Sequence, residues 1–150
     1  MPGLPGAILF ACNLNRVRSP IAAGLMTRLF GARVYVDSCG LRQDPNFEVD
    51  PFAVAVMDEV GVDLSLHRSK AFEDVDDGSF DAVISLAPEA HHRALELGRR
   101  SAVDIAYWPT PDPTLVTGSR SVVLDAYRDV RARLEARILE RFPQTRTFGG

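Results

Sequence analysis

Cysteine is scarce in this sequence: two occur in 150 residues, and their spacing is not that of a metal site. A small secreted domain held by disulfides needs a dense set of cysteines, so that class is excluded. Apolar runs are also short, well below the roughly 20 residues that a membrane-spanning helix needs. The stretch from Met1 to Gly6 lacks the charged start of a signal peptide. We therefore expect a cytosolic protein without membrane contact.

Positive charge is not in excess either. Lysine and arginine number 17 against 20 aspartates and glutamates, a net charge of −3, and the basic residues are scattered. A nucleic-acid partner normally requires a basic patch, so none is expected, and an anionic substrate would have to be captured locally. With 46% hydrophobic residues, the chain is long enough for one globular domain spanning 1–150 and too short for a second.

Short apolar segments alternate with segments of helical periodicity along the whole chain. The predicted strands are 7–11, 33–37, 80–86 and 102–108. The predicted helices are 20–30, 51–60, 88–98 and 121–142. Such alternation is typical of α/β proteins in which helices cover both faces of a parallel sheet. The acidic stretch from Phe72 to Gly78 is expected to be solvated surface.

The segment after the first predicted strand carries the most specific chemistry. Cys12 ends the apolar run, five residues follow, and Arg18, Ser19 and Pro20 come next. Serine is a good helix cap and proline is best tolerated at the first helical position, so a helix should begin there. The loop between Cys12 and Arg18 would then gather backbone N–H groups at the positive end of a helix, which is a binding site for an anion.

Cys12 and Arg18 supply the two groups that cysteine-dependent phosphoryl transfer needs. The thiolate is the nucleophilic form of cysteine, and both the N–H groups and the nearby guanidinium favour it. Arg18 presents a planar fork of donors that fits two oxygens of a phosphate. The phosphate-binding loop would consist of Asn13, Leu14, Asn15, Arg16, Val17 and Arg18.

The run Cys-Asn-Leu-Asn-Arg-Val-Arg-Ser-Pro resembles the phosphate loop of the low-molecular-weight protein tyrosine phosphatases. Its position directly after an N-terminal buried strand makes the match specific. The resemblance implies a flavodoxin-like, three-layer fold with four parallel strands in the order 2-1-3-4. It also implies hydrolysis of aryl phosphates, with protein phosphotyrosine as the expected substrate, through a phosphocysteine intermediate on Cys12. Phosphate would be product and inhibitor, and no metal or other cofactor would be required.

The leaving group of such a reaction needs a proton from a general acid. The proline-rich loop after the fourth predicted strand holds a single carboxylate, Asp112. Taken alone, Asp112-Pro113 between prolines is typical of a turn. The family carries its general acid in an Asp-Pro loop at this place, so the resemblance implies that Asp112 protonates the leaving oxygen and later activates water.

The resemblance also implies a supporting network behind the loop. In the family, the loop asparagine is held by the loop serine, by a serine after the second strand and by a histidine. The residues in matching places are Asn15, Ser19, Ser38 and His67. Ser19 would in addition donate a hydrogen bond to the Cys12 sulfur. Without the resemblance, His67 would more simply be structural or exposed.

Three residues depart from the usual pattern of the family. Leu14 replaces a common glycine, Val17 replaces a common second cysteine, and Cys39 replaces a small residue. Cys39 is either a small buried thiol or a redox partner of Cys12, since the end of the second strand should approach the loop. The cleft walls are expected to include Leu14, Arg16, Phe47 and Trp108.

Two other functions stay open. A thioredoxin-linked arsenate reductase shares this fold and loop, but its relay uses two further cysteines after the third strand, and residues 85–100 contain none. Cys39 alone could serve in a shortened relay. A non-catalytic oxyanion-binding domain would need neither the thiol nor the acid, so the joint presence of Cys12 and Asp112 argues against it.

Overall fold

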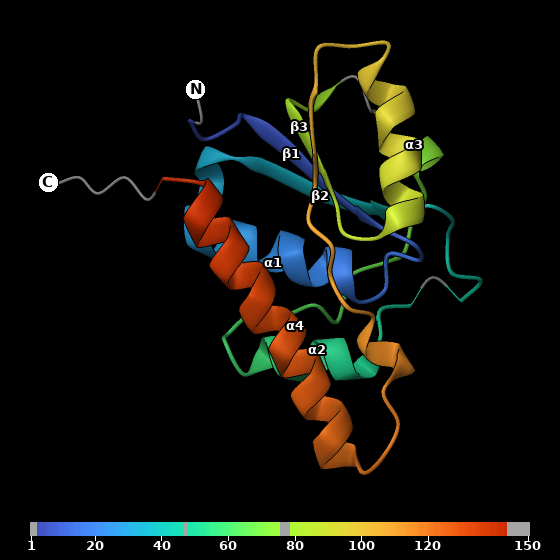
Figure 1. Ribbon diagram of the computed structural model, residues 1–150. Coiled ribbons are helices and arrows are strands. Elements are labelled where there is room, and N and C mark those ends of the chain that lie inside the picture. The colour runs from blue at the N-terminus through green and yellow to red at the C-terminus, as the bar shows by residue number, and fades with distance from the viewer. Residues whose placement is uncertain (1–2, 47, 76–78, 144–150) are drawn as a thin grey trace, which may run out of the picture.

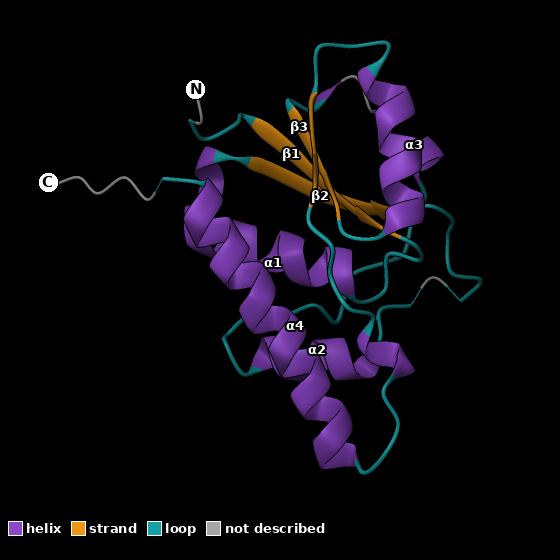
Figure 2. Cartoon of the chain, viewed as in Figure 1, coloured by secondary structure: helices purple, strands orange, loops and turns teal. Residues whose placement is uncertain are grey.

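The computed structural model describes residues 3–46, 48–75 and 79–143. Its centre is a four-stranded parallel sheet in the order β2-β1-β3-β4 (Figures 1 and 2). The strands are β1 (Ala7–Cys12), β2 (Tyr35–Gly40), β3 (Ala82–Ser85) and β4 (Asp104–Tyr107). The predicted α/β class and strand order are therefore confirmed.

Helices cover both faces of this sheet. They are α1 (Arg18–Phe30), α2 (Pro51–Asp58), α3 (Pro88–Gly98) and α4 (Arg120–Arg141). α3 packs on one face, α1 and α4 pack on the other, and α2 lies against α1 and α4 on the side away from the sheet (Figure 1). In the described part of the chain, no helix combines the length and the hydropathy needed to cross a membrane.

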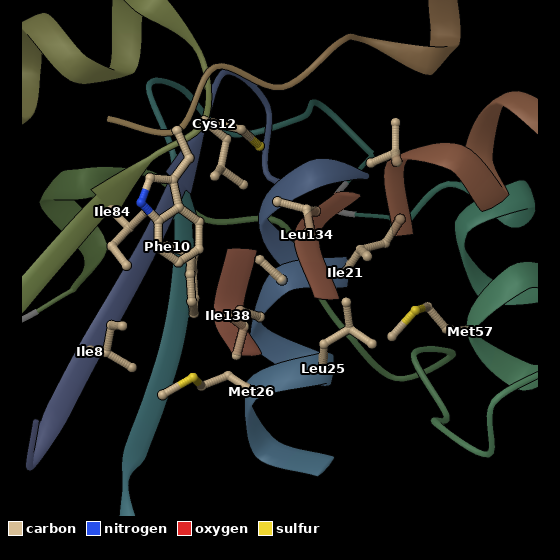
Figure 3. Packing of buried hydrophobic residues seen from close by; sticks show 14 of the residues in the cluster. Ile8, Phe10, Cys12, Ile21, Leu25, Met26, Met57, Ile84, Leu134 and Ile138 are labelled. Atoms are coloured by element: carbon tan, nitrogen blue, oxygen red, sulfur yellow. The ribbon is translucent and has the colours of Figure 1, made fainter. Parts of the chain in front are cut away.

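Strand β1 is buried along its whole length. Alternate side chains contribute to two separate hydrophobic clusters. Ile8, Phe10 and Cys12 belong to the cluster with α1, α2 and α4, part of which Figure 3 shows. Ala7, Leu9 and Ala11 belong to the cluster under α3. Because both faces are covered, the strand is apolar throughout instead of alternating between apolar and polar residues.

Three predictions about elements need correction. β2 starts at Tyr35 and continues to Gly40, three residues beyond the predicted end, because Gly40 still pairs with Cys12. The stretch expected to be solvated surface contains a turn of 3-10 helix, Phe72–Asp74, and Phe72 is buried in the cluster under α3. α1 begins at Arg18, two residues before the predicted start.

The loops that follow β1, β3 and β4 meet at one edge of the sheet. The Leu86 N–H donates to the Ala11 carbonyl and the Trp108 N–H donates to the Ser85 carbonyl, both at 2.8 Å. The chain leaves β1 into a helix on one face and leaves β3 into a helix on the other. This edge is thus the switch point where ligands bind in open α/β sheets. The loop between Cys12 and Arg18 lies there.

Candidate active site

Cys12 ends β1 and is 2% exposed. Its Sγ lies 2.9 Å from the Ser19 Oγ, which is buried in the first turn of α1. The same hydroxyl lies 3.2 Å from the Cys39 carbonyl oxygen, so its single proton can be given to either acceptor. Toward a Cys12 thiolate, which only accepts hydrogen bonds, Ser19 would be the donor.

Ser19 does not cap α1, contrary to the sequence-based prediction. The cap residue is Val17, which makes no side-chain hydrogen bond to the helix. The Ser19 hydroxyl is instead occupied by Cys12, by the Cys39 carbonyl and by the Asn15 amide. In the described structure no side chain of the cap residue bonds the first turn, and an uncapped helix end of this kind can face an anion.

The carbonyl oxygens of the loop are all turned outward. Each one from Cys12 to Arg16 accepts a hydrogen bond from a neighbouring segment. In loop order, the donors are the Leu41 N–H (2.9 Å), the Arg42 N–H (3.0 Å), the Ser69 hydroxyl (2.7 Å), His67 Nε2 (2.9 Å) and the Asp50 N–H (3.1 Å). In a trans peptide the N–H points opposite to the carbonyl. The N–H groups of residues 13–17 therefore converge inside the loop as an anion-binding nest.

Asn15 has the left-handed backbone that this loop requires, with a φ of 59°. Asparagine tolerates that conformation better than most residues. Its buried side chain donates to the Ser19 hydroxyl (2.8 Å) and the Ser38 hydroxyl (2.9 Å) and accepts from the Lys70 N–H (3.0 Å). The structure thus brings together Asn15, Ser19 and Ser38, which the resemblance to the family implied as one network.

His67 closes the same network from the opposite side. Its Nε2 lies 2.9 Å from the Asn15 carbonyl oxygen, so a neutral ring with the proton on Nε2 donates to the loop. Burial lowers the pKa of His67 below its usual value, although the Asn15 carbonyl acts in the opposite direction. The ring is therefore favoured in its neutral form, in which it still provides the donor that the loop needs.

Arg18 and Asp112 meet over the mouth of the loop. Arg18 is 8% exposed, and its guanidinium donates from Nη1 to the Thr110 carbonyl at 3.0 Å. Its Nη2 lies 3.9 Å from the Asp112 Oδ2. The other carboxylate oxygen of Asp112 accepts from the Thr114 N–H (3.0 Å) and hydroxyl (2.6 Å). One oxygen of Asp112 is thus anchored, while the other faces the arginine.

These groups surround a pocket of about 140 Å³. Its lining residues are Cys12, Asn13, Leu14, Arg16, Val17, Arg18, Asp112 and Thr114. None of them is aromatic, so in the described residues the pocket has no ring to stack on a phenyl group.

Two of the four expected cleft walls are found at the pocket, namely Leu14 and Arg16. Trp108 is not, because it is 4% exposed and its ring packs in the core against Phe10, with ring centroids 6.1 Å apart. Phe47 lies outside the described residues. The prediction for Trp108 was wrong because strand β4 ends one residue before it and its side chain turns into the α1 and α4 cluster.

Cys39 lies on the other face of the sheet from Cys12. It pairs in register with Ala11 and belongs, with Ala11, to the cluster under α3, whereas Cys12 belongs to the opposite cluster. Cys39 is 0% exposed, and burial, followed by the nearby Cys12 and Asp37, raises the pKa of its thiol far above the usual value. Of the two interpretations made from sequence, the small buried thiol fits and the redox partner does not.

Several residues that hold the loop were missed by sequence reasoning. They are Asp50, Ser69, Lys70 and Thr110, which bond the loop, the Asn15 side chain or Arg18. Asp50, Lys70 and Thr110 do so through the backbone, which carries no residue signature. The only sequence signal for Ser69 is its place two residues after His67. Among the described residues, no three histidines, cysteines or carboxylates converge to hold a metal ion.

Comparison with known proteins points to one family, and several of the proteins matched are arsenate reductases. The family model described as low molecular weight phosphotyrosine protein phosphatase matches residues 7–142. The chain is 30% identical over 106 residues to arsenate reductase 1 of Staphylococcus epidermidis, covering 71% of this chain and 76% of that protein. A solved structure described as an arsenate reductase in the phosphate binding state superimposes with a TM-score of 0.69, at 28% identity over 89% of this chain and 94% of that chain.

A second curated relative is matched over a shorter stretch. The chain is 38% identical over 79 residues to the glutaredoxin arsenate reductase of Synechocystis sp., which is 53% of this chain. The match spans 58% of that protein, less than two thirds of its length. The activity of that whole protein can therefore be carried over to this chain only as a hypothesis.

Proposed function

The chain belongs to the low-molecular-weight phosphotyrosine protein phosphatase family, and from this premise we propose that it is an arsenate reductase. In this proposal Cys12 attacks the oxyanion and an external thiol completes the reduction. The observation that carries the proposal is the nest itself. Five successive carbonyl oxygens, beginning with that of Cys12, are hydrogen-bonded to neighbouring segments and so point away from the inside of the loop. The named relatives favour arsenate over an aryl ester.

The first step is a displacement at arsenic. The Cys12 thiolate forms a sulfur–arsenic bond, one oxygen of arsenate leaves as hydroxide, and Asp112 supplies the proton that turns it into water. The N–H groups of the nest and the Arg18 guanidinium stabilise the remaining oxygens. Ser19 donates to the sulfur. Asp112 suits its role because its Oδ1 is anchored by Thr114 while Oδ2 stays on the pocket side, near Arg18.

The second step transfers two electrons to arsenic. An external thiolate attacks the Cys12 sulfur, the sulfur–arsenic bond breaks, and arsenite leaves with the bonding pair. A second thiol then reduces the mixed disulfide and regenerates Cys12. In total, one arsenate and two thiols give one arsenite, one disulfide and one water. The thiols must come from outside because Cys39, the other cysteine of the chain, lies in the opposite cluster.

Hydrolysis of aryl phosphates is the second candidate, and the position of Asp112 favours it. A phenolate leaves poorly without a proton, and the carboxyl group of Asp112, which lines the pocket beside Arg18, would provide one when it is protonated. The adduct would then be phosphocysteine, which water cleaves. Hydrolysis was the leading interpretation from sequence, but the curated relatives are arsenate reductases, so it takes second place.

The two candidates are separated by assays on the same purified, reduced protein. Arsenate-dependent NADPH oxidation is followed with glutathione, glutaredoxin and glutathione reductase, or with thioredoxin and thioredoxin reductase, as the thiol supply. Hydrolysis of para-nitrophenyl phosphate is followed from about pH 4 to 8, a range that brackets typical acid and base groups. Three variants accompany the parent: Cys12→Ser, Asp112→Asn and, as the matched thiol control, Cys39→Ala.

We expect arsenate-dependent NADPH oxidation that is abolished in Cys12→Ser and kept in Cys39→Ala. Asp112→Asn should lower the rate by about 10² to 10⁴, the usual contribution of a general acid. If the parent hydrolyses para-nitrophenyl phosphate but oxidises no thiol with arsenate, the phosphatase takes first place. If it does neither and only binds oxyanions, both catalytic proposals fail.

A further inference from the structure

The Ser69 hydroxyl joins the phosphate loop to the segment after β2. Ser69 is 2% exposed and lies between α2 and the 3-10 turn Phe72–Asp74. Its Oγ donates to the Leu14 carbonyl at 2.7 Å and accepts from the Asp44 N–H at 2.8 Å. Both hydrogen-bonding roles of the hydroxyl are thus in use. In the described part of the chain, Ser69 is the partner of the Leu14 carbonyl.

That carbonyl belongs to the peptide whose rotation would remove the positive φ of Asn15. A rotation of the Leu14–Asn15 peptide by half a turn leaves the Cα atoms nearly in place and changes the φ of Asn15 from 59° to about −120°. The second value lies in the φ range that residues with a side chain ordinarily adopt, whereas the first is costly for such a residue. The φ preference of Asn15 therefore favours the rotated peptide, and a contact from outside the peptide must oppose it.

The rotated peptide would damage the nest. It would remove the Asn15 N–H from the interior of the loop and put the Leu14 carbonyl oxygen in its place, where it would repel an oxyanion. The bonds from the Asn15 side chain to Ser19, Ser38 and Lys70 hold that side chain and do not select the orientation of the preceding peptide. The bond from Ser69 does select it, because its acceptor is the carbonyl that would move.

We propose that Ser69 is a positioning residue that holds the Leu14–Asn15 peptide with its N–H facing the bound oxyanion. His67 does the same for the next carbonyl along the loop. The inference rests on the oxyanion-binding part of the proposed function and is independent of which reaction follows. Ser69 acts through the loop and does not itself touch the substrate.

The test measures binding of inorganic phosphate by calorimetry to the parent, Ser69→Ala, Ser69→Cys and Ser69→Thr. Ser65→Ala, in the same segment but exposed, is the matched control. Ser69→Ala and Ser69→Cys should bind phosphate more weakly by roughly three- to tenfold, the factor expected for one net hydrogen bond. Ser69→Thr keeps the hydroxyl and should resemble the parent. Thermal unfolding of every variant identifies any that is not folded.

Kinetics separate positioning from a merely structural role. A bound oxyanion favours the loop in which the Asn15 N–H faces inward. Ser69→Ala should therefore show a raised KM and a nearly unchanged kcat, with KM and the phosphate Kd rising by the same factor. Loss of folded protein would instead lower kcat and leave KM unchanged. The turnover assay is whichever of the two reactions the parent performs.

The outcomes distinguish this inference from the proposed function. If the parent binds phosphate and folded Ser69→Ala and Ser69→Cys bind it equally well, the inference is wrong while the function stands. If Ser69→Thr folds and binds as weakly as Ser69→Ala, the hydroxyl is not the active group and the inference is wrong as well. If the parent binds no phosphate, there is no functional nest, and both proposals fall together.

Discussion

Asn15 illustrates how the type of a single residue can indicate its backbone conformation. A left-handed conformation costs a residue with a side chain roughly 1–2 kcal/mol, and asparagine adopts it more readily than most. In this loop the φ is 59°, and the hydrogen bonds from Ser69 to the Leu14 carbonyl and from His67 to the Asn15 carbonyl offset the cost. Removing those bonds one at a time is therefore expected to affect the loop before it affects the fold.

The lowered pKa of His67 predicts a pH dependence of stability. In the folded protein the ring stays neutral, whereas in the unfolded chain it takes up a proton near its ordinary pKa of 6.5. The unfolded state thus binds more protons, so stability falls as the pH drops through 6.5 toward the lower folded pKa. Urea unfolding at pH 7.5, 6.5 and 5.5 should show a loss in the parent that is smaller in His67→Gln.

The control for this prediction is His92→Gln. His92 is exposed on α3, away from the loop, so its replacement should leave the pH dependence of the parent unchanged. Equal losses of stability in the parent and in His67→Gln would show that His67 does not titrate differently on unfolding. In that case its bond to the Asn15 carbonyl would be insensitive to protonation of the ring.

Cys39 is predicted to be unreactive in the folded protein. It is 0% exposed, and burial raises the pKa of its thiol, so little of the reactive thiolate forms at neutral pH. Iodoacetamide should label Cys12 in the native protein and Cys39 after denaturation, as read by peptide mass spectrometry. Inorganic phosphate should protect Cys12. A disulfide between Cys12 and Cys39 after mild oxidation of the native protein would contradict the observed pairing of β1 with β2.

At the scale of elements, the end of β2 sets the shape of the phosphate loop. Gly40 pairs with Cys12, and a β-carbon at its position would lie 2.8 Å from the Asn13 carbonyl oxygen and 2.9 Å from the Asn15 nitrogen. These neighbours are backbone atoms of the loop and cannot move aside as a side chain can. The absence of a side chain at Gly40 is what lets the strand and the loop pack together.

Gly40→Ala should therefore impair oxyanion binding more than it impairs folding. Overpacking of this kind costs about 1–3 kcal/mol, and here the strain falls on the peptides that form the nest. Phosphate titration and urea unfolding of the same variant measure the two effects. The matched control is Gly98→Ala, whose new β-carbon would lie 2.9 Å from a side-chain atom of Ile105. It should lose some stability and bind phosphate normally; equal binding by both variants would show that Gly40 does not shape the nest.

At the scale of the whole molecule, a buried hydrogen bond ties the last helix to the first turn of α2. The Tyr127 hydroxyl on α4 donates to the Asp50 Oδ2 at 2.9 Å, and Asp50 caps α2 through its other oxygen. The Asp50 N–H in turn bonds the Arg16 carbonyl of the phosphate loop. Segments from both halves of the chain thus meet behind the site.

Tyr127→Phe should lower the free energy of unfolding by about 1–3 kcal/mol, because it leaves a buried carboxylate oxygen without its partner. Phosphate affinity should change little, since the bond to the Arg16 carbonyl comes from the backbone of Asp50. Tyr35→Phe, at a side chain that is 59% exposed, is the control and should match the parent in both measurements. A large loss of affinity in Tyr127→Phe would mean that α4 controls the loop directly.

The alternation of apolar segments predicted the α/β sheet, and the resemblance of the loop motif to the phosphatase family implied the strand order and the network around Asn15. Helix α3 was predicted to the residue, since Pro88 and Gly98 mark its ends in the chain. The cap of α1 was not, because Ser19 has stronger partners in the folded state than its own helix. Ser69 escaped prediction, and Trp108 was wrongly placed at the cleft, because the roles of both residues depend on what lies beside them in space.

The sequence by itself determined the α/β fold and the composition of the oxyanion loop, because apolar periodicity and the spacing from Cys12 to Arg18 are local properties of the chain. Only the tertiary structure decided whether Cys39 lies on the same face of the sheet as Cys12. In the observed register Ala11 pairs with Cys39 and Cys12 pairs with Gly40, so the two thiols point to opposite faces of the sheet. A shift of one residue would have put both on the same face, since side chains alternate along a strand. Register between distant strands is set by packing on both faces, which no local pattern specifies.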